Sequence, residues 1–182
     1  MKRLLLTLFL ILAFAVPVFG AGDTFVVTTD NIIYDSNGPK MRVLTCTFLA
    51  NSADGTIADL TIYGAEANSA TYPRGYWSDG TSTTALRAPL TGWFLYQVEI
   101  DANHAGTEPT ENSELYILKN GYDILAGNGV DQVDNSAERM VFASDGATSI
   151  KAPITDTIVV RVTQQAGVTN SATGTVKLIL VP

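Results

Sequence analysis

Only one histidine and one cysteine occur among the 182 residues, which restricts the nucleophilic chemistry open to this chain. A serine–histidine pair needs a histidine to accept the hydroxyl proton, and only His104 could serve. It lies in a polar segment directly after a predicted strand, and the chain contains no Gly-x-Ser-x-Gly sequence. Cys46 shares one strand face with Leu44 and Phe48, which favours a buried, unreactive thiol. We therefore expect no nucleophilic catalysis.

Glu99 and Asp101 are the carboxylates best placed for acid–base chemistry. They stand at positions i and i+2 of one predicted strand, so their side chains project from the same face, and the pattern places Trp93 further along that face. Two carboxylates beside an aromatic ring are groups that a glycoside hydrolase could use. Solvent-facing strands often carry the same pattern, so a small hydrolase is our third hypothesis and we name no catalytic residue.

Asp131, Asp134 and Asp145 are candidate ligands for calcium. Carboxylate and amide oxygens are the ligands that Ca²⁺ prefers, and calcium often rigidifies exported β-domains that lack disulfides. Further oxygen donors lie nearby in the sequence, namely Asp123, Asn135 and Glu138. The spacing matches neither an EF-hand loop nor a glycine-rich repeat. We therefore expect solvated acidic turns and no bound cofactor, and we keep calcium as the alternative.

Tyr72, Tyr76 and Trp77, with Arg74 between them, form the most aromatic segment outside the predicted strands. Such rings could stack on a sugar or anchor a protein partner. Alternatively, they could cap the open end of a β-sandwich core. This segment is our candidate contact surface.

The first twenty residues have the three parts of a secretory signal peptide. Lys2 and Arg3 precede an apolar run over 4–16, which is shorter than the roughly 20 residues of a membrane-spanning helix, and residues 17–20 end in Gly20. We expect cleavage after Gly20 and export to the periplasm, the cell surface or the medium. Residues 21–182 would then form the mature domain.

Charge and cysteine content narrow the range of partners. Loss of Lys2 and Arg3 with the leader changes the net charge from −7 to about −9. Nucleic acid and anionic lipid would repel such a chain, so we expect neither nucleic-acid nor membrane binding after signal cleavage. A single cysteine allows no internal disulfide. An exported domain must then be held together by packing, by oligomerisation or by a metal.

Short runs of β-branched, aromatic and leucine residues recur between Gly, Pro, Asn, Asp and Ser, which is the pattern of β-strands. We expect strands at 24–29, 41–50, 57–63, 93–101, 114–118, 139–143, 156–164 and 174–181. Helical periodicity is absent from the sequence. About eight strands without interleaved helices predict an all-β fold, a single antiparallel β-sandwich or jelly-roll-like domain.

Turn residues predict two hairpins and two long loops. The small, polar segment 166–173 is expected to join the last two strands as an antiparallel hairpin, and Asn120-Gly121 is expected to form a type I′ turn. Long loops are expected at 64–89 and 126–138. Such loops often carry function in compact β-domains.

The segments 90–101, 106–112, 116–118 and 123–129, together with the predicted closing hairpin, resemble a group of small β-sandwich proteins encoded among the structural genes of tailed phages and prophages. The shared pattern is a strand, a Gly-Thr-x-Pro-Thr-x-Asn turn, a strand ending near an aspartate, and a Leu-Ala-Gly-x-Gly turn. This resemblance implies a non-enzymatic virion or surface component that works by assembly. The leader departs from it, because ordinary phage structural proteins assemble in the cytoplasm.

The favoured hypothesis is therefore a non-catalytic, exported structural or adhesive β-domain. It would act by self-association or by binding a protein partner. The alternative is a carbohydrate-binding module that uses the aromatic segment, with a glycan as partner.

Overall fold

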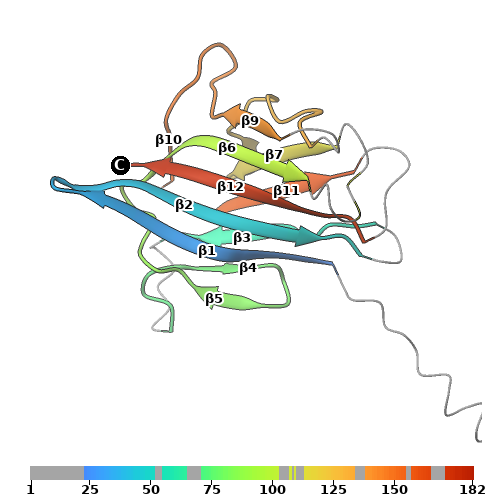
Figure 1. Cartoon of the computed structure of the whole chain (residues 1–182), viewed down its shortest axis with the longest axis horizontal. Helices are drawn as coiled ribbons and strands as arrows, with labels where there is room; N and C mark the ends of the chain where they lie inside the picture. Colours follow the sequence, from blue (N-terminus) through green and yellow to red (C-terminus); the bar gives the residue numbers. More distant parts are fainter. Residues whose placement is uncertain are drawn as a thin grey trace, which may run out of the picture.

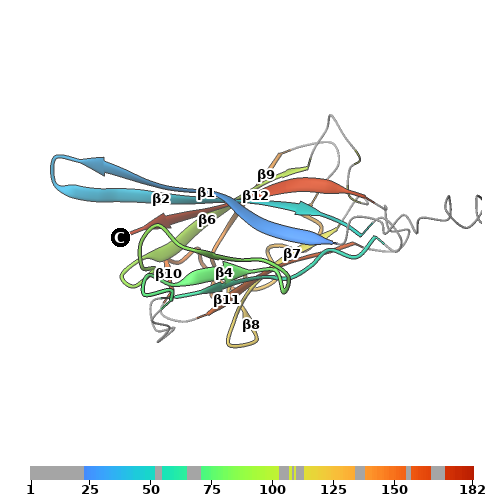
Figure 2. The same cartoon turned by 90° about the horizontal axis from the view of Figure 1, so that it is seen from below.

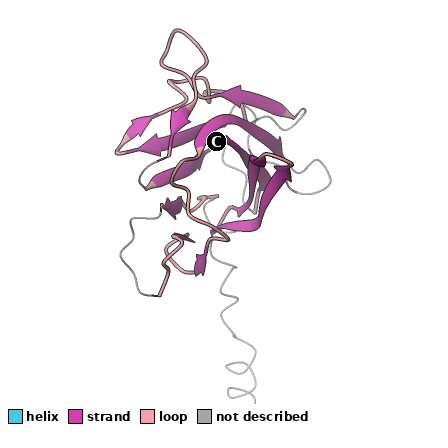
Figure 3. Ribbon diagram, turned by 90° about the vertical axis from the view of Figure 1, so that its left-hand side faces the viewer, coloured by secondary structure: helices cyan, strands magenta, loops and turns pink. Residues whose placement is uncertain are grey.

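Most strands alternate inward apolar residues with outward polar ones, so two sheets can each bury one face against the other. The computed structural model describes residues 23–51, 55–64, 71–102, 107, 109, 113–133, 138–154, 157–164 and 171–182. Every regular element in these ranges is a strand, and the strands form two packed antiparallel sheets (Figure 3). The expected all-β sandwich is confirmed. The predicted signal peptide lies outside the described residues.

The first sheet has the strand order β1-β2-β12-β6-β10, with β9 also paired to β6 (Figure 1). Its members are β1 (Thr24–Asp35), β2 (Gly38–Leu49), β6 (Phe94–Ala102), β9 (Arg139–Phe142), β10 (Ala152–Pro153) and β12 (Thr173–Val181). The second sheet has the order β5-β4-β3-β11-β7-β8. Its members are β3 (Leu60–Tyr63), β4 (Tyr76–Ser78), β5 (Thr83–Ala85), β7 (Glu114–Lys119), β8 (Tyr122–Asp123) and β11 (Ile158–Thr163). No described helix is long and apolar enough to cross a membrane.

The core lies between the sheets and is filled from every second position of the central strands. In β2, β12 and β11 the fully or almost fully buried apolar side chains are Leu44, Cys46, Phe48, Val176, Leu178, Leu180, Ile158, Val160 and Val162. Burial of one such side chain contributes about 1.5–3 kcal/mol, so these period-2 stripes account for the pairing of the two faces.

The predicted hairpin between the last two strands is wrong. β11 pairs with β3 and β7 in the second sheet, whereas β12 pairs with β2 and β6 in the first. The two strands therefore face each other across the core. Alternation of side chains identifies which face of a strand is buried, but it does not identify the neighbouring strand.

One predicted turn is present in the structure, whereas a second hairpin and two short strands were not predicted. Asn120 and Gly121 have φ of 51° and 82° and join β7 to β8, as the Asn-Gly signal indicated. The predicted strand 24–29 extends to Asp35 and forms a long hairpin with β2 through Ser36 and Asn37, which the sequence analysis missed. It also missed β4 and β5, which lie inside the predicted loop 64–89.

Arg42 is a charged residue at an inward-facing position of β2. Its side chain is fully buried, and its guanidinium donates two hydrogen bonds to Asp30 on β1, from Nε to Oδ1 at 2.8 Å and from Nη2 to Oδ2 at 2.7 Å. It also donates to the carbonyl oxygens of Ala88 and Pro89, at 2.7 and 2.8 Å. The Arg87 amide donates to Asp30 as well, at 2.7 Å. These bonds attach the β5–β6 connection to the β1–β2 hairpin and so link the two sheets.

We expect Asp30→Ala to lower the free energy of unfolding by about 3–5 kcal/mol, because it leaves the buried Arg42 guanidinium without its negative partner. Asp35→Ala is the matched control, since its ion pair with Lys40 is solvent-exposed and should contribute no more than about 1 kcal/mol. Urea unfolding followed by circular dichroism measures both. Equal losses in the two variants would contradict a central role for the buried pair.

Candidate functional site

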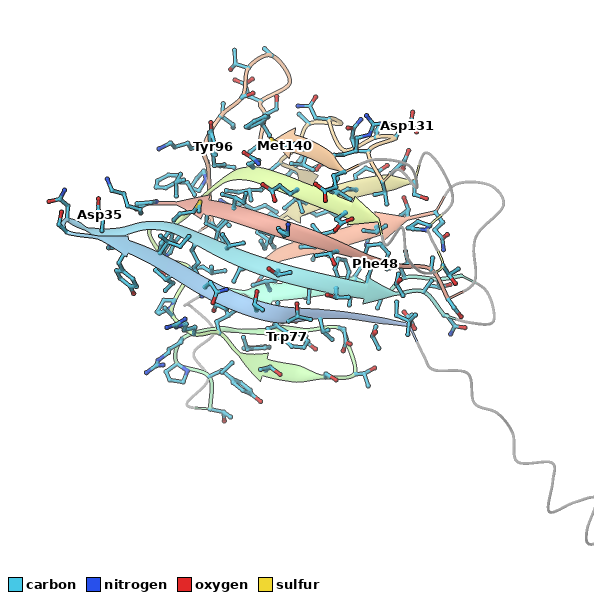
Figure 4. The ribbon with its side chains drawn as sticks, viewed as in Figure 1. Asp35, Phe48, Trp77, Tyr96, Asp131 and Met140 are labelled. Carbon is cyan, nitrogen blue, oxygen red and sulfur yellow. The ribbon has the colours of Figure 1, made fainter. Side chains whose placement is uncertain are left out.

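The predicted aromatic segment divides between the two faces of the second sheet. Gly75 has a φ of +80°, and a Cβ there would collide with the Tyr63 carbonyl oxygen, so glycine lets the chain pass closely against β3. Tyr76 then pairs with Tyr63, and the following residue, Trp77, points the other way. Trp77 is 6% exposed and belongs to the core (Figure 4). Trp77 is therefore a core residue, whereas the alternative interpretation expected all three rings to cap the open end of the core.

A row of three half-buried tyrosines remains on the outer face. The Tyr63 and Tyr76 rings stack at 4.2 Å and 22°, and the Tyr72 ring lies 5.0 Å from Tyr76. Partial burial and the neighbouring phenols of Tyr63 and Tyr72 raise the pKa of Tyr76, so this phenol is neutral at physiological pH. Arg74 is exposed and donates to the Arg87 carbonyl oxygen at 3.3 Å. The row offers apolar ring surface together with phenol hydrogen bonds.

Glu99 and Asp101 do not share a face with Trp93. A register shift in the pairing of β6 with β12 leaves both Tyr96 and Gln97 facing outward, which reverses the alternation beyond them. Trp93 therefore packs in the core, while the two carboxylates lie on the outer face of the first sheet. The expected combination of paired carboxylates and an aromatic ring is wrong.

Glu99 is held by its neighbours on that outer face. It accepts a hydrogen bond from Gln97 at 3.1 Å and lies 3.4 Å from the Lys177 ammonium. A surface depression of about 220 Å³ surrounds it, and its lining includes Arg139 and Met140. Two basic side chains thus partly neutralise the carboxylates of this depression.

The candidate calcium ligands are not brought together in the described part of the chain. Asp145 accepts hydrogen bonds from the backbone amides of Thr148 and Ala147, at 2.8 and 3.0 Å, and these bonds lower its pKa. Asp131 is exposed in a turn with a φ of 55°, and Asp134 lies outside the described residues. The described residues contain no group of three or more potential metal ligands.

Of the two candidate groups for nucleophilic catalysis, Cys46 and His104, the structure describes only Cys46. Cys46 is fully buried, and its burial, together with the Asp30 charge, raises the pKa of the thiol far above its ordinary value. A neutral buried thiol is a poor nucleophile. His104 lies outside the described residues.

The outer half of the β1–β2 hairpin is a surface that the sequence analysis missed. This half projects beyond the body of the sandwich (Figure 2), with Asp35 near its tip (Figure 4). Ile33 and Tyr34 are 47% and 63% exposed on it, and β1 is the edge strand of its sheet in the described structure. Asn37-Gly38 between two apolar runs was the sequence signal that could have indicated this hairpin.

No protein-family model matches the sequence, and neither a curated protein nor a solved structure matches it.

We expect Trp77→Ala to lower the free energy of unfolding by about 3–5 kcal/mol, because it removes a large buried ring. Arg74→Ala, at an exposed position three residues earlier, should change it by about 0.5 kcal/mol or less. Denaturant unfolding of the two variants tests this difference. A Trp77→Ala variant as stable as the wild type would show that the ring is not part of the core.

A calcium chelator should change the melting temperature by no more than about 2 °C, because Asp145 accepts backbone amides and Asp131 is exposed in a separate turn. Calcium held at a hundredfold excess over its Kd would instead stabilise the fold by roughly 2.7 kcal/mol, which corresponds to several degrees. Differential scanning calorimetry with and without chelator distinguishes the two outcomes. A loss of several degrees that calcium restores would show a bound ion.

Proposed function

We propose that this protein is a non-catalytic, exported structural or adhesive β-domain that acts by contact, chiefly through association of its own copies. The observation that carries the proposal is the projecting β1–β2 hairpin. It holds two large apolar side chains, Ile33 and Tyr34, in solvent on an edge strand. Edge strands in proteins that stay monomeric are usually short, charged or covered. An edge with exposed apolar residues is therefore suited to pairing with another chain.

The surroundings of the ionisable side chains and the sequence resemblance support the same proposal. Of the groups considered for chemistry, Glu99 accepts a hydrogen bond from Gln97, Asp145 accepts backbone amides, and the Cys46 thiol is buried. The resemblance of the sequence to small β-sandwich proteins encoded among phage structural genes implies a component that works by assembly. The setting could be a virion-like particle or a cell surface, since assembly by strand pairing serves both.

The tyrosine row on the second sheet supports a second candidate, a carbohydrate-binding module. Stacked rings with phenol hydroxyls are a common platform for the apolar face of a sugar. Here Tyr63, Tyr72 and Tyr76 supply that platform, and Arg74 lies beside it. Trp77, buried beneath them, would support the platform without touching the ligand.

Sedimentation velocity of the mature chain, from about 10 μM to about 1 mM, tests the favoured proposal. We expect the weight-average sedimentation coefficient to rise with concentration, because pairing through a short edge is weak. A glycan array on the same protein tests the second candidate. A chain that stays monomeric throughout and binds glycans, with binding lost in Tyr76→Ala, would overturn the assembly proposal.

A further inference from the structure

The two halves of β1 differ in how regular their free edge is, and only a regular edge can pair with a further strand. Near Thr28 the pairing with β2 shifts by one residue, which is a β-bulge, and the Thr28 hydroxyl donates to the Thr45 carbonyl oxygen at 3.1 Å. Bulges interrupt regular strand addition at an edge. Beyond Asp30 the strand runs without a bulge of its own, because the second register shift places the extra residue, Lys40, on β2. The edge suitable for pairing is therefore 31–35.

This outer edge is electrically balanced although the chain is acidic. Asp30, at its inner end, is paired with the buried Arg42, and Asp35, at its tip, lies 3.0 Å from the Lys40 ammonium. Between the two aspartates the residues are Asn31, Ile32, Ile33 and Tyr34. A second copy can therefore approach this edge without placing like charges opposite each other.

From this edge we infer that two copies of the chain pair through β1, antiparallel and in one register, to join their first sheets into a continuous sheet. The inference rests on the proposed function and specifies its interface. In the register centred on Ile33, each Ile33 stands opposite the same residue of the second copy. Ile32 then stands opposite the second copy's Tyr34, and Asn31 opposite its Asp35. All apolar side chains meet apolar ones, and an amide meets a carboxylate.

Neighbouring registers lose this match. A shift of the centre to Ile32 places Ile33 opposite Asn31 and Tyr34 opposite Asp30, so apolar side chains oppose polar or charged ones. A centre between Ile32 and Ile33 would place these two residues opposite each other, although they lie on opposite faces of the sheet. A twofold axis perpendicular to the sheet does not allow that pairing, because it keeps each side chain on its own face. A shift of the centre to Tyr34 places Ile33 opposite Asp35 and Ile32 opposite Ser36, which again sets apolar side chains against charged or polar ones. The exposed residues therefore select one register.

The same register brings each hairpin tip to a groove on the other copy. Ser36 of one copy stands opposite Asp30 of the other, and Asn37 opposite Thr29, at the rim of a groove of about 220 Å³. Its lining combines the edge of β1 with the end of β5, and its residues are Val27, Thr28, Thr29, Asp30, Trp77, Thr84, Ala85, Leu86 and Arg87. The groove is open to solvent and large enough to receive small polar side chains. The tip contacts add area to an edge that is short by the standard of stable dimers.

Cysteine cross-linking of the mature chain tests the register. Paired antiparallel residues have Cα atoms about 4.5–5.5 Å apart, within the range that a disulfide spans. Ile33→Cys should therefore form a disulfide-linked dimer under mild oxidation. Asn31→Cys is the matched control on the same strand face, because its two copies would be offset by four residues, about 14 Å. Wild-type protein gives the background, since its only cysteine, Cys46, is buried.

Sedimentation of a charged variant provides the second readout. Ile33→Lys should weaken self-association about tenfold, because it places two like charges opposite each other and removes an apolar pair. Tyr122→Lys, at a residue 79% exposed on β8, should leave it unchanged. Both positions are solvent-exposed, so the melting temperatures should stay close to that of the wild type.

The outcomes separate this inference from the proposed function. If the wild type associates but Ile33→Lys associates equally well, or Asn31→Cys cross-links as readily as Ile33→Cys, the β1 interface is wrong while assembly stands. If the wild type stays monomeric at every concentration and Ile33→Cys gives no more dimer than the background, both are wrong. Selective cross-linking at Ile33 together with weakened association of Ile33→Lys supports both.

Discussion

The buried ion pair between Arg42 and Asp30 is the constraint that fixes where the edge of the first sheet meets the β5–β6 connection. A guanidinium removed from water is costly unless its donors are satisfied, and here a carboxylate and two carbonyl oxygens receive them. Satisfying that charge requires the β5–β6 connection to lie against the β1–β2 hairpin. The pair thus fixes how the edges of the two sheets meet, in a chain whose one cysteine allows no internal disulfide.

The same pair divides β1 into parts with different roles. On the inner side, Phe25 lies in the core, and a bulge at Thr28 interrupts the edge beside the groove. On the outer side, the hairpin projects past the body and keeps Ile33 and Tyr34 in solvent. Anchoring at Asp30 lets the inner part remain fixed to the core while the outer part is presented as a strand edge. The proposed assembly surface is therefore a consequence of how the core is closed.

Small local irregularities decide which side chains can act together. The register shift at Tyr96 and Gln97 moves Glu99 and Asp101 to the face opposite Trp93, so an apparent sugar-hydrolysing arrangement does not form. In β4 the side chains alternate regularly. Trp77 is therefore buried, and Tyr76 on the other face stacks on Tyr63. One displaced residue inverts every side chain that follows it. A grouping of carboxylates with an aromatic ring that is inferred from sequence therefore depends on the absence of a bulge between the carboxylates and the ring.

The sequence by itself determined the all-β class, the buried phase of most strands and the Asn120-Gly121 turn, because alternation and turn chemistry act between residues close in the chain. It also contained a sign of a buried charge, since Arg42 lies on the same strand face as Leu44, Cys46 and Phe48. Only the tertiary structure decided that β11 and β12 lie in different sheets, that Asp30 is the partner of Arg42, and that the outer half of β1 is an edge. These features depend on contacts between segments distant in sequence, and local patterns do not specify which distant segments meet.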